Sequence, residues 1–254
     1  MKDLTIIIPV HKFNDAINAL LTKAYDSVIN MDENLNIMIV GPNDVINNCK
    51  NVLNNDKIIY VENNENIDFC SQVNLGAKNC KTKYLSILEF DDTFKKNWLK
   101  NVEAYLKFKS DVSIFLPLTE IVNTDGKVLS FINEVALASA FSNELGYLDL
   151  DCLQVYMDFN VTGGIINTND FNEVGGLKSS LKIASWYELL MRFCHNGKKI
   201  YVLPKVGYSH MINRDDSLMK KEQEEITPEE GAWLIKTAQQ EYFFKEDRKK
   251  TFSK

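Results

Sequence analysis

The sequence predicts an α/β fold with a mostly parallel central sheet flanked by helices, and three observations lead to that prediction. Short apolar or β-branched runs alternate with helical segments along the first half of the chain, which is the pattern of parallel α/β sheets. Residues 4–9 form an almost continuous β-branched run, as expected of a strand buried on both faces. The chain has 254 residues, of which 45% are hydrophobic and 25% charged, so its composition is that of an ordinary globular protein.

The remaining elements of the first half follow in alternating order. Asn14 or Asp15 is expected to cap a helix that carries its apolar side chains on one face. The next strand covers residues 36–40 and ends at Gly41 and Pro42. Further along the chain we expect strands at residues 57–61, 84–88 and 111–117, and helices at residues 68–79 and around Trp98.

The pattern changes after Pro117, where a small antiparallel element is expected. A turn at residues 123–126 joins two short apolar runs, which predicts a hairpin. The other expected elements are an ambiguous, helical stretch at residues 149–159, a helix at 186–194, a strand at 199–203 and a helix that begins near Thr227. We therefore predict one domain over residues 1–218 and a helical extension over residues 219–254, which either packs back on the domain or forms a homo-oligomer.

Charge and cysteine usage exclude several classes of protein. The net charge is −6 and no basic stripe stands out, so nucleic-acid binding is not expected. The five cysteines are scattered, without a Cys-x-x-Cys pair, which indicates reduced thiols and argues against a zinc site. No apolar run approaches transmembrane length and no signal peptide is recognisable, so we expect a cytoplasmic protein.

Three acidic residues, Glu89, Asp91 and Asp92, follow the apolar strand at residues 84–88. Acidic side chains are costly inside a sheet unless they are paired, whereas at the carboxyl end of a strand they lie in the crevice where ligands bind. Carboxylate oxygens suit Mg²⁺ or Mn²⁺, and such an ion is usually bound together with a phosphate. The alternative is a loop whose acids end the strand and cap the helix around Trp98.

Several short motifs occur in an order that is typical of a known family. They are Thr5-Ile-Ile-Ile-Pro-Val10, Ser71-Gln-Val-Asn-Leu-Gly-Ala77, Lys83-Tyr-Leu-Ser-Ile-Leu-Glu-Phe-Asp-Asp92, Gly163-Gly164 with Phe171-Asn-Glu-Val-Gly-Gly176, Glu188-Leu-Leu-Met-Arg192, and His210-Met-Ile-Asn-Arg-Asp-Asp-Ser217. Together they resemble the family 2 glycosyltransferases, and the resemblance runs from residue 4 to residue 218. It implies the GT-A fold, with a Rossmann-like central sheet.

The resemblance also implies a nucleotide-sugar donor and a divalent ion, Mn²⁺ or Mg²⁺, that stabilises the departing diphosphate as a Lewis acid. By position, Asp91 is the implied metal ligand, with Glu89 and Asp92 beside it. Glu89 stands where the family has Asp, and its longer side chain keeps the charge but alters the geometry around the donor. His210 is implied as a nitrogen ligand or a phosphate contact; the alternative is a histidine hydrogen-bonded to backbone.

The nucleotide-binding residues implied by position are Pro9 and His11 beside the base, and Asn74 near the ribose or base. The alternative for Asn74 is a helix residue that bonds a neighbouring loop. The family's second strand ends in an Asp that reads the base or ribose. Here Gly41 stands at that place, and Asp44 is the candidate substitute from a shifted loop.

The catalytic base of the family is missing from its expected place. Ser185 and Trp186 stand where inverting members have Glu-Asp, and neither side chain replaces a carboxylate as general base. Glu188, Asp158 and Glu173 are candidates by neighbourhood only, and for each the alternative is a surface or capping acid. Trp186 has two interpretations, a core anchor or a platform on which a sugar ring stacks.

Two functions from different classes follow. The first is a metal-dependent glycosyltransferase that moves a hexose-type sugar to an unknown acceptor hydroxyl of a glycan or protein, with inversion. The second is a catalytically degenerate GT-A domain that binds a glycan or nucleotide, or serves as a scaffold. A dinucleotide-dependent oxidoreductase is not supported, because no Gly-x-Gly-x-x-Gly follows the first strand.

Overall fold

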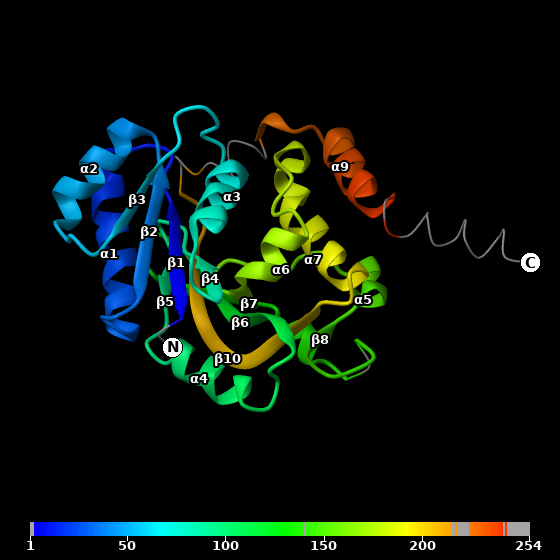
Figure 1. Cartoon of the computed structure of the whole chain (residues 1–254). Helices are drawn as coiled ribbons and strands as arrows, with labels where there is room; N and C mark the ends of the chain where they lie inside the picture. Colours follow the sequence, from blue (N-terminus) through cyan, green and yellow to red (C-terminus); the bar gives the residue numbers. More distant parts are fainter. Residues whose placement is uncertain (1–2, 140, 215–216, 218–223, 241, 243–254) are drawn as a thin grey trace, which may run out of the picture.

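The computed structural model describes residues 3–139, 141–214, 217, 224–240 and 242. Its first half alternates strands and helices as predicted (Figure 1). These elements are β1 (Leu4–Pro9), α1 (Asp15–Met31), β2 (Asn36–Gly41), α2 (Asn43–Leu53), β3 (Ile59–Glu62), α3 (Phe69–Asn79) and β4 (Tyr84–Ile87). Helix α1 is capped by Asn14, whose side chain accepts a hydrogen bond from the Ile17 amide at 2.9 Å.

The second half contains shorter elements and one long strand, β10 (Lys199–Met211). The helices are α4 (Trp98–Leu106), α5 (Leu150–Val155), α6 (Thr168–Glu173), α7 (Ser185–His195) and α9 (Pro228–Gln240), with 3₁₀ turns η1 (Glu134–Leu137) and η2 (Ser179–Ala184). The strands are β5 (Thr93–Phe94), β6 (Val112–Val122), β7 (Val128–Ile132), β8 (Tyr147–Leu148) and β9 (Ile165–Asn167).

In the described part of the chain the strands form one ten-stranded sheet, in which eight strands follow the order β3-β2-β1-β4-β9-β6-β10-β5, while β7 pairs with β6 and β8 with β10 off this path. Strands β3, β2, β1 and β4 pair in parallel, and β10 is parallel to β6. The short strand β9 is antiparallel to both of its neighbours, β4 and β6. The predicted mixed α/β fold with a mostly parallel sheet is confirmed, and the predicted hairpin is the antiparallel pair β6–β7.

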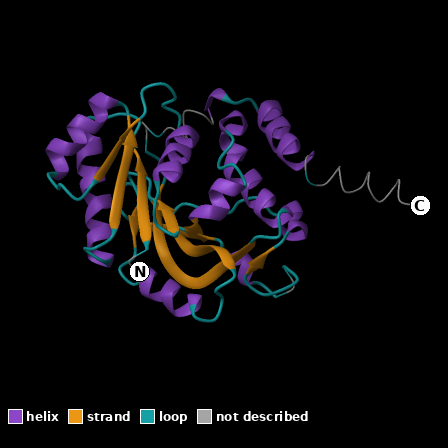
Figure 2. Cartoon of the chain, viewed as in Figure 1, coloured by secondary structure: helices purple, strands orange, loops and turns teal. Residues whose placement is uncertain are grey.

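Three predicted elements differ in length from the observed ones. The strand predicted at residues 111–117 continues past Pro117 to Val122 as β6. The helical stretch predicted at residues 149–159 is a helix only over α5, which ends as Tyr156 turns to an extended backbone. The strand predicted at residues 199–203 continues to Met211 as a long curved strand (Figure 2). This continuation matters because it carries His210 to the same edge of the sheet as the residues that follow β4.

Helices cover both faces of the sheet, and alternate residues of the strands face opposite sides, as the pleat requires. In β1, Ile7 packs in the cluster that includes α3, α6 and α7, while Leu4, Ile6 and Ile8 pack in the cluster under α1, α2 and α4. Figure 1 shows α1 and α2 on one side of β1 to β3 and α3 on the other. Burial on both faces explains why the strands are apolar without alternation.

The C-terminal helix α9 packs back on the domain. Leu234, Ala238 and Tyr242 are buried in the cluster that contains α7, and α9 contacts α7 and η2. This is one of the two alternatives that the sequence left open. The proposed boundary between residues 218 and 219 lies outside the described residues.

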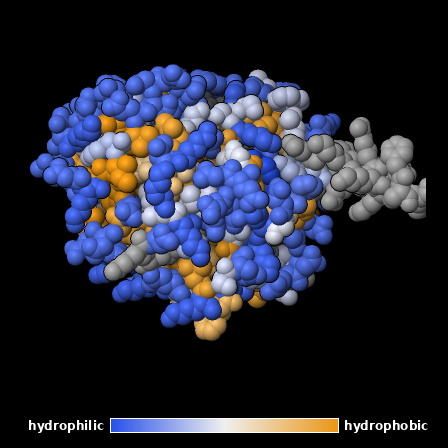
Figure 3. Space-filling view, viewed as in Figure 1, coloured by the Kyte–Doolittle hydropathy of each residue, from blue (hydrophilic) through white to orange (hydrophobic). Residues whose placement is uncertain are grey.

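The face of the molecule in Figure 3 is largely hydrophilic, and hydrophobic residues show on it in limited patches. Among the described residues, none of the helices combines the length and the apolar character that a membrane crossing would need.

Candidate active site

The acidic segment after β4 is held by the core on one side and reaches a pocket on the other. The Leu88 amide donates to the Ile7 carbonyl at 2.9 Å, and the side chains of Leu88 and Phe90 are buried in the core. Glu89 and Asp91 line the pocket. The chain turns at Phe90 and Asp91, where the Asp92 amide donates to the Glu89 carbonyl at 3.0 Å, and this turn keeps Leu88 and Phe90 in the core while Glu89 and Asp91 reach the pocket.

Asp92 is almost fully buried, with 1% of its surface exposed, and both of its oxygens are engaged. One oxygen lies 2.8 Å from Nδ1 of His210, and the other accepts from the Met211 amide at 2.7 Å. Both partners come from the end of β10. The pairing fixes the His210 ring through Nδ1, which leaves Nε2 as the nitrogen that can take a metal ion.

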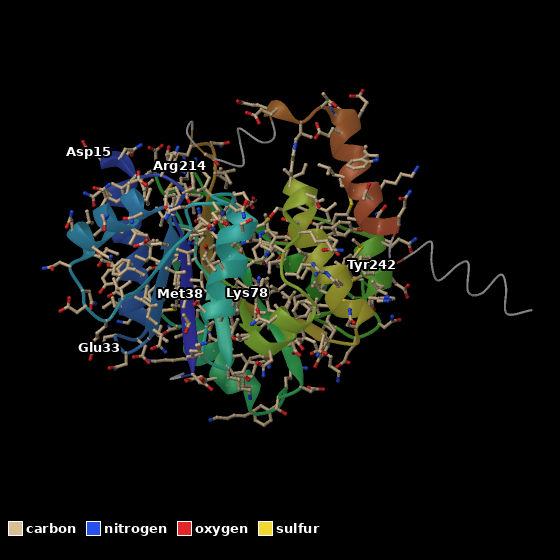
Figure 4. All side chains as sticks on the ribbon, turned by 45° about the horizontal axis from the view of Figure 1, so that its top comes forward. Asp15, Glu33, Met38, Lys78, Arg214 and Tyr242 are labelled. Carbon is tan, nitrogen blue, oxygen red and sulfur yellow. The ribbon has the colours of Figure 1, made fainter. Side chains whose placement is uncertain are left out.

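Arg214 follows β10 and lies beside the same carboxylates. Its guanidinium is 3.1 Å from the Asp91 carboxylate, and its central carbon lies 5.0 Å from the centre of the Phe90 ring. Figure 4 labels Arg214 near the upper edge of the molecule in that view. We call Glu89, Asp91, Asp92, His210 and Arg214 the pocket cluster. It contains three acids and two cationic side chains.

Three groups of the pocket cluster, Glu89, Asp91 and His210, have raised pKa values. Burial, with a contribution from the Asp92 carboxylate, raises the pKa of Glu89 from 4.5 to about 8. The same two causes raise the pKa of Asp91 from 3.8 to about 6, although Arg214 opposes the rise. Burial alone would lower the pKa of His210, but the Asp92 carboxylate beside it raises that pKa from 6.5 to about 10.

The pocket cluster fits a divalent metal ion. Glu89, Asp92 and His210 each offer a ligand atom within 4.8 Å of the others. Carboxylate oxygens with an imidazole nitrogen suit Mn²⁺, and suit Mg²⁺ less because that ion favours oxygen ligands. Because both Asp92 oxygens already accept hydrogen bonds, Asp92 is better suited to hold His210 than to bind the ion directly. Asp91 is separated from this group by its pairing with Arg214.

The residues predicted to bind the nucleotide are only partly brought together. Pro9 and His11 line the pocket beside Glu89 and Asp91, and the rings of His11 and Phe90 lie 5.6 Å apart. Asp44 is exposed in the first turn of α2 and is not among the pocket-lining residues.

Asn74 connects α3 to the loop that contains Gly175 and Gly176. Its amide nitrogen donates to the Leu177 carbonyl and its oxygen accepts from the Leu177 amide, both at 2.8 Å. A Cβ atom on Gly176, which has a φ of +67°, would lie 2.3 Å from the Asn74 oxygen, so the glycine permits this approach. The alternative interpretation of Asn74, a helix residue that bonds a loop, is what the structure contains.

None of the general-base candidates is among the pocket-lining residues. Trp186 is half-buried and packs edge-on against Phe69, which lines the pocket. Glu188 is 1% exposed and is held by Arg192 at 2.6 Å, by Lys178 at 2.7 Å and by the hydroxyl of Tyr242. We call these four residues, Lys178, Glu188, Arg192 and Tyr242, the helix cluster. Asp158 is exposed, and Glu173 pairs with Lys198 at 2.7 Å.

Sequence reasoning did not single out five of the pocket-lining residues, namely Phe69, Gln72, Phe90, Arg214 and Ser217. Phe69 and Gln72 are three residues apart on α3, so they lie on one face of the helix. That spacing was visible in the sequence, but it is also the spacing of ordinary core residues. For Arg214 the signal was its position four residues after His210 in a polar loop.

Comparisons with known proteins agree on one family. The sequence profile of glycosyl transferase family 2 matches residues 5–148. An uncharacterized glycosyltransferase of Rickettsia felis is 30% identical over 136 residues, a stretch that covers 51% of this chain and 21% of that protein. An uncharacterized glycosyltransferase of Rickettsia conorii is 29% identical over 135 residues, again 51% and 21% of the two proteins. The chain thus spans about a fifth of the length of these curated relatives.

Solved structures share the fold at low sequence identity. Residues 1–349 of TarS from S. aureus in complex with UDP-GlcNAc superimpose with a TM-score of 0.67 and 15% identity, over 93% of this chain and 65% of that one. The same TarS fragment without a named ligand gives a TM-score of 0.62 with 16% identity, over 82% of this chain and 60% of that one. The predicted GT-A fold is therefore confirmed.

Proposed function

This chain belongs to glycosyl transferase family 2, and on that premise we propose that it transfers a sugar from a nucleotide-diphosphate sugar to an acceptor hydroxyl, with a divalent metal ion at the pocket cluster. The observation that carries the proposal is that Glu89, Asp91 and Arg214 line one pocket with Pro9, while the paired Asp92 and His210 offer ligand atoms within 4.8 Å of that of Glu89. A fold neighbour was solved with UDP-GlcNAc, which supports a UDP-sugar as the first donor to test.

The residues that would hold the ion are Glu89, Asp91 and Nε2 of His210, with Asp92 fixing the His210 ring. When bound, a divalent ion supplies Lewis-acid stabilisation of the diphosphate leaving group. Asp91 would have to give up its pairing with Arg214 to bind the ion, and the Arg214 guanidinium would then be a donor for phosphate oxygens at the same pocket. The Arg214 guanidinium lies over the Phe90 ring, 5.0 Å from its centre, in a cation–π contact.

The structure supports binding of the donor more than activation of the acceptor hydroxyl. Ser185 is buried, and Glu188 is enclosed by Arg192, Lys178 and Tyr242. General-base help is typically worth about 10²–10⁴ in rate. These observations favour a second candidate function, a GT-A domain that binds a nucleotide or glycan without transferring a sugar.

Thermal unfolding with nucleotides and metal ions tests the first function. We expect UDP or a UDP-sugar to raise Tm in the presence of Mn²⁺ and not with EDTA; a ligand at 100 times its Kd adds about 2.7 kcal/mol to the free energy of unfolding. Asp91→Asn should reduce the shift, whereas Asp26→Asn, an exposed acid on α1, should leave it unchanged. GDP, ADP and CDP complete the series.

Hydrolysis of the donor separates the two candidate functions. Release of UDP from a bound UDP-sugar, lost in Asp91→Asn, supports the transferase. A metal-dependent Tm shift without any turnover supports the binding domain instead. If no nucleotide shifts Tm with Mn²⁺, both the transferase and the nucleotide-binding interpretation are wrong.

A further inference from the structure

Gln72 is a buried amide with one unused hydrogen-bonding atom at the pocket. Its side chain is fully buried on α3 and lines the pocket together with Pro9, His11 and Phe69. Its Nε2 donates to the Ile67 carbonyl at 2.8 Å. Among the residues that the structure describes, its Oε1 has no hydrogen-bond partner.

The orientation of this amide is determined by its neighbour. A carbonyl oxygen can only accept, so the amide nitrogen must face Ile67 and the oxygen is the atom left over. Burying an unpaired acceptor lowers the free energy of unfolding, and native proteins contain few such groups. An unpaired acceptor on a residue that lines a pocket therefore marks a ligand with an N–H group.

The pocket that Gln72 lines has both aromatic and charged surface. Phe69, Phe90, His11 and Pro9 supply apolar and aromatic surface, whereas the charged lining comes from Glu89, Asp91 and Arg214. A mostly apolar wall with one well-placed polar atom is the usual composition of a subsite for an aromatic ring. A nucleotide diphosphate presents a base and a charged group, and the pocket offers a surface for each.

Gly41 explains why the acceptor comes from α3. This residue ends β2, where the family pattern has a base-reading Asp. A Cβ atom on Gly41 would lie only 2.3 Å from the Val10 carbonyl oxygen, so no side chain fits at this position. Its nearest acidic neighbour in sequence, Asp44, is exposed and is not a pocket-lining residue. The acceptor for the base must therefore come from another element.

We propose that Oε1 of Gln72 accepts the ring N3–H of uracil and so makes this site select uridine nucleotides. The inference rests on the proposed function and names the base of its donor. Uracil offers one ring N–H, which matches one acceptor. Cytosine has a lone pair at N3 that would face the Gln72 oxygen, and guanine presents two adjacent N–H donors where the amide offers a single acceptor.

Binding of a matched ligand series tests the proposal without any mutation. Affinities of UDP, CDP and N3-methyl-UDP are measured by calorimetry with Mn²⁺ on the full chain. UDP is expected to bind at least about tenfold more tightly than either of the others, because each leaves the buried oxygen without its donor. Equal affinities of UDP and CDP would overturn the inference and leave the proposed function standing.

Gln72→Met tests the residue itself, and Gln154→Met on the exposed face of α5 is the matched control. Gln72→Met should bring the ratio of the CDP and UDP dissociation constants close to one, while affinity for inorganic pyrophosphate stays unchanged. The control should keep the wild-type ratio. A Gln72→Met protein that still prefers UDP would show that another group reads the base. If no nucleotide binds the wild type at all, the proposed function fails and this inference fails with it.

Discussion

The pocket cluster and the helix cluster contain the same kinds of charged side chain, but in different proportions of acids to cations. Glu188 of the helix cluster is surrounded by two cationic side chains and a tyrosine hydroxyl. In the pocket cluster three acids share two cationic side chains, and the pKa values of Glu89 and Asp91 are raised. Figure 4 labels Arg214 of the first cluster and Tyr242 of the second in well-separated parts of the molecule.

The difference shows which acids are structural and which are available to a ligand. Arg192 also donates to the carbonyl of Gly176 at 2.6 Å and to that of Val174, so the helix cluster joins α7 to the loop before η2. Its carboxylate has partners on both oxygens and holds helices together. With all three acids ionised the pocket cluster would carry one negative charge more than it has positive charges, which is why the pKa values of Glu89 and Asp91 are raised and why a cation at the pocket would favour their ionised forms.

The largest expected effect is the loss of stability in Glu188→Ala. Removing the carboxylate leaves Arg192 buried without its acidic partner, so the free energy of unfolding should fall by about 3–5 kcal/mol. Urea denaturation measures it. A loss below about 1 kcal/mol would mean that the helix cluster does not hold α7 in place, and the contrast between the clusters would be wrong.

The second largest effect is expected of Asp92→Asn, on metal-dependent binding of UDP. If Asp92 positions His210 for a metal ion, the variant should weaken Mn²⁺-dependent UDP binding by about 10- to 100-fold. The asparagine oxygen can still accept from the Met211 amide, so folding should be largely retained. Calorimetry on both proteins measures the change, and unchanged affinity would exclude Asp92 from the site.

Tyr242→Phe should have a smaller effect on stability than Glu188→Ala. It deletes one hydrogen bond to the Glu188 carboxylate and keeps the ring that packs in the core, at a cost of about 1.5 kcal/mol. Because Tyr242 follows α9, the result also tests how firmly the C-terminal helix is attached. A wild-type urea midpoint would show that α9 adds nothing to the stability of the domain.

The last expected effect is a pH dependence of stability that belongs to the pocket cluster. The folded pKa of Glu89 is about 8 against 4.5, and that of His210 about 10 against 6.5, so the native state binds more protons than the unfolded state. Metal-free protein should therefore lose stability as pH rises from 4.5 through 8 and on toward 10.

Glu89→Gln should flatten this pH dependence between pH 4.5 and 8. Glu33→Gln, at an exposed position labelled in Figure 4, should keep the wild-type curve. The measurement is Tm against pH in EDTA. A wild-type protein that gains stability over this range would show that the acids of the pocket cluster are not crowded.

Much of the fold could be predicted because the spacing of apolar residues along the sequence reflects which side chains are buried. The apolar runs at β1, β2 and β4 revealed a sheet covered on both faces, and Asn14 and Thr227 marked helix starts where a side chain bonds the first turn. The length of β10 could not be predicted, because Lys205 and Gly207 interrupt the apolar pattern while the strand continues by pairing with β6. Pairing with a distant strand is invisible in local sequence.

The sequence by itself determined the order of the elements, the acidic segment after β4 and the absence of a side chain at Gly41, because each of these is a local property of residue type. Only the tertiary structure decided which side chains pair with each other. It joined Asp92 to His210 across 118 residues, enclosed Glu188 and left the oxygen of Gln72 unpaired at a pocket. The reason is physical: whether a carboxylate is neutralised, or an amide satisfied, depends on groups within a few ångströms, and in a folded chain those groups come from distant segments.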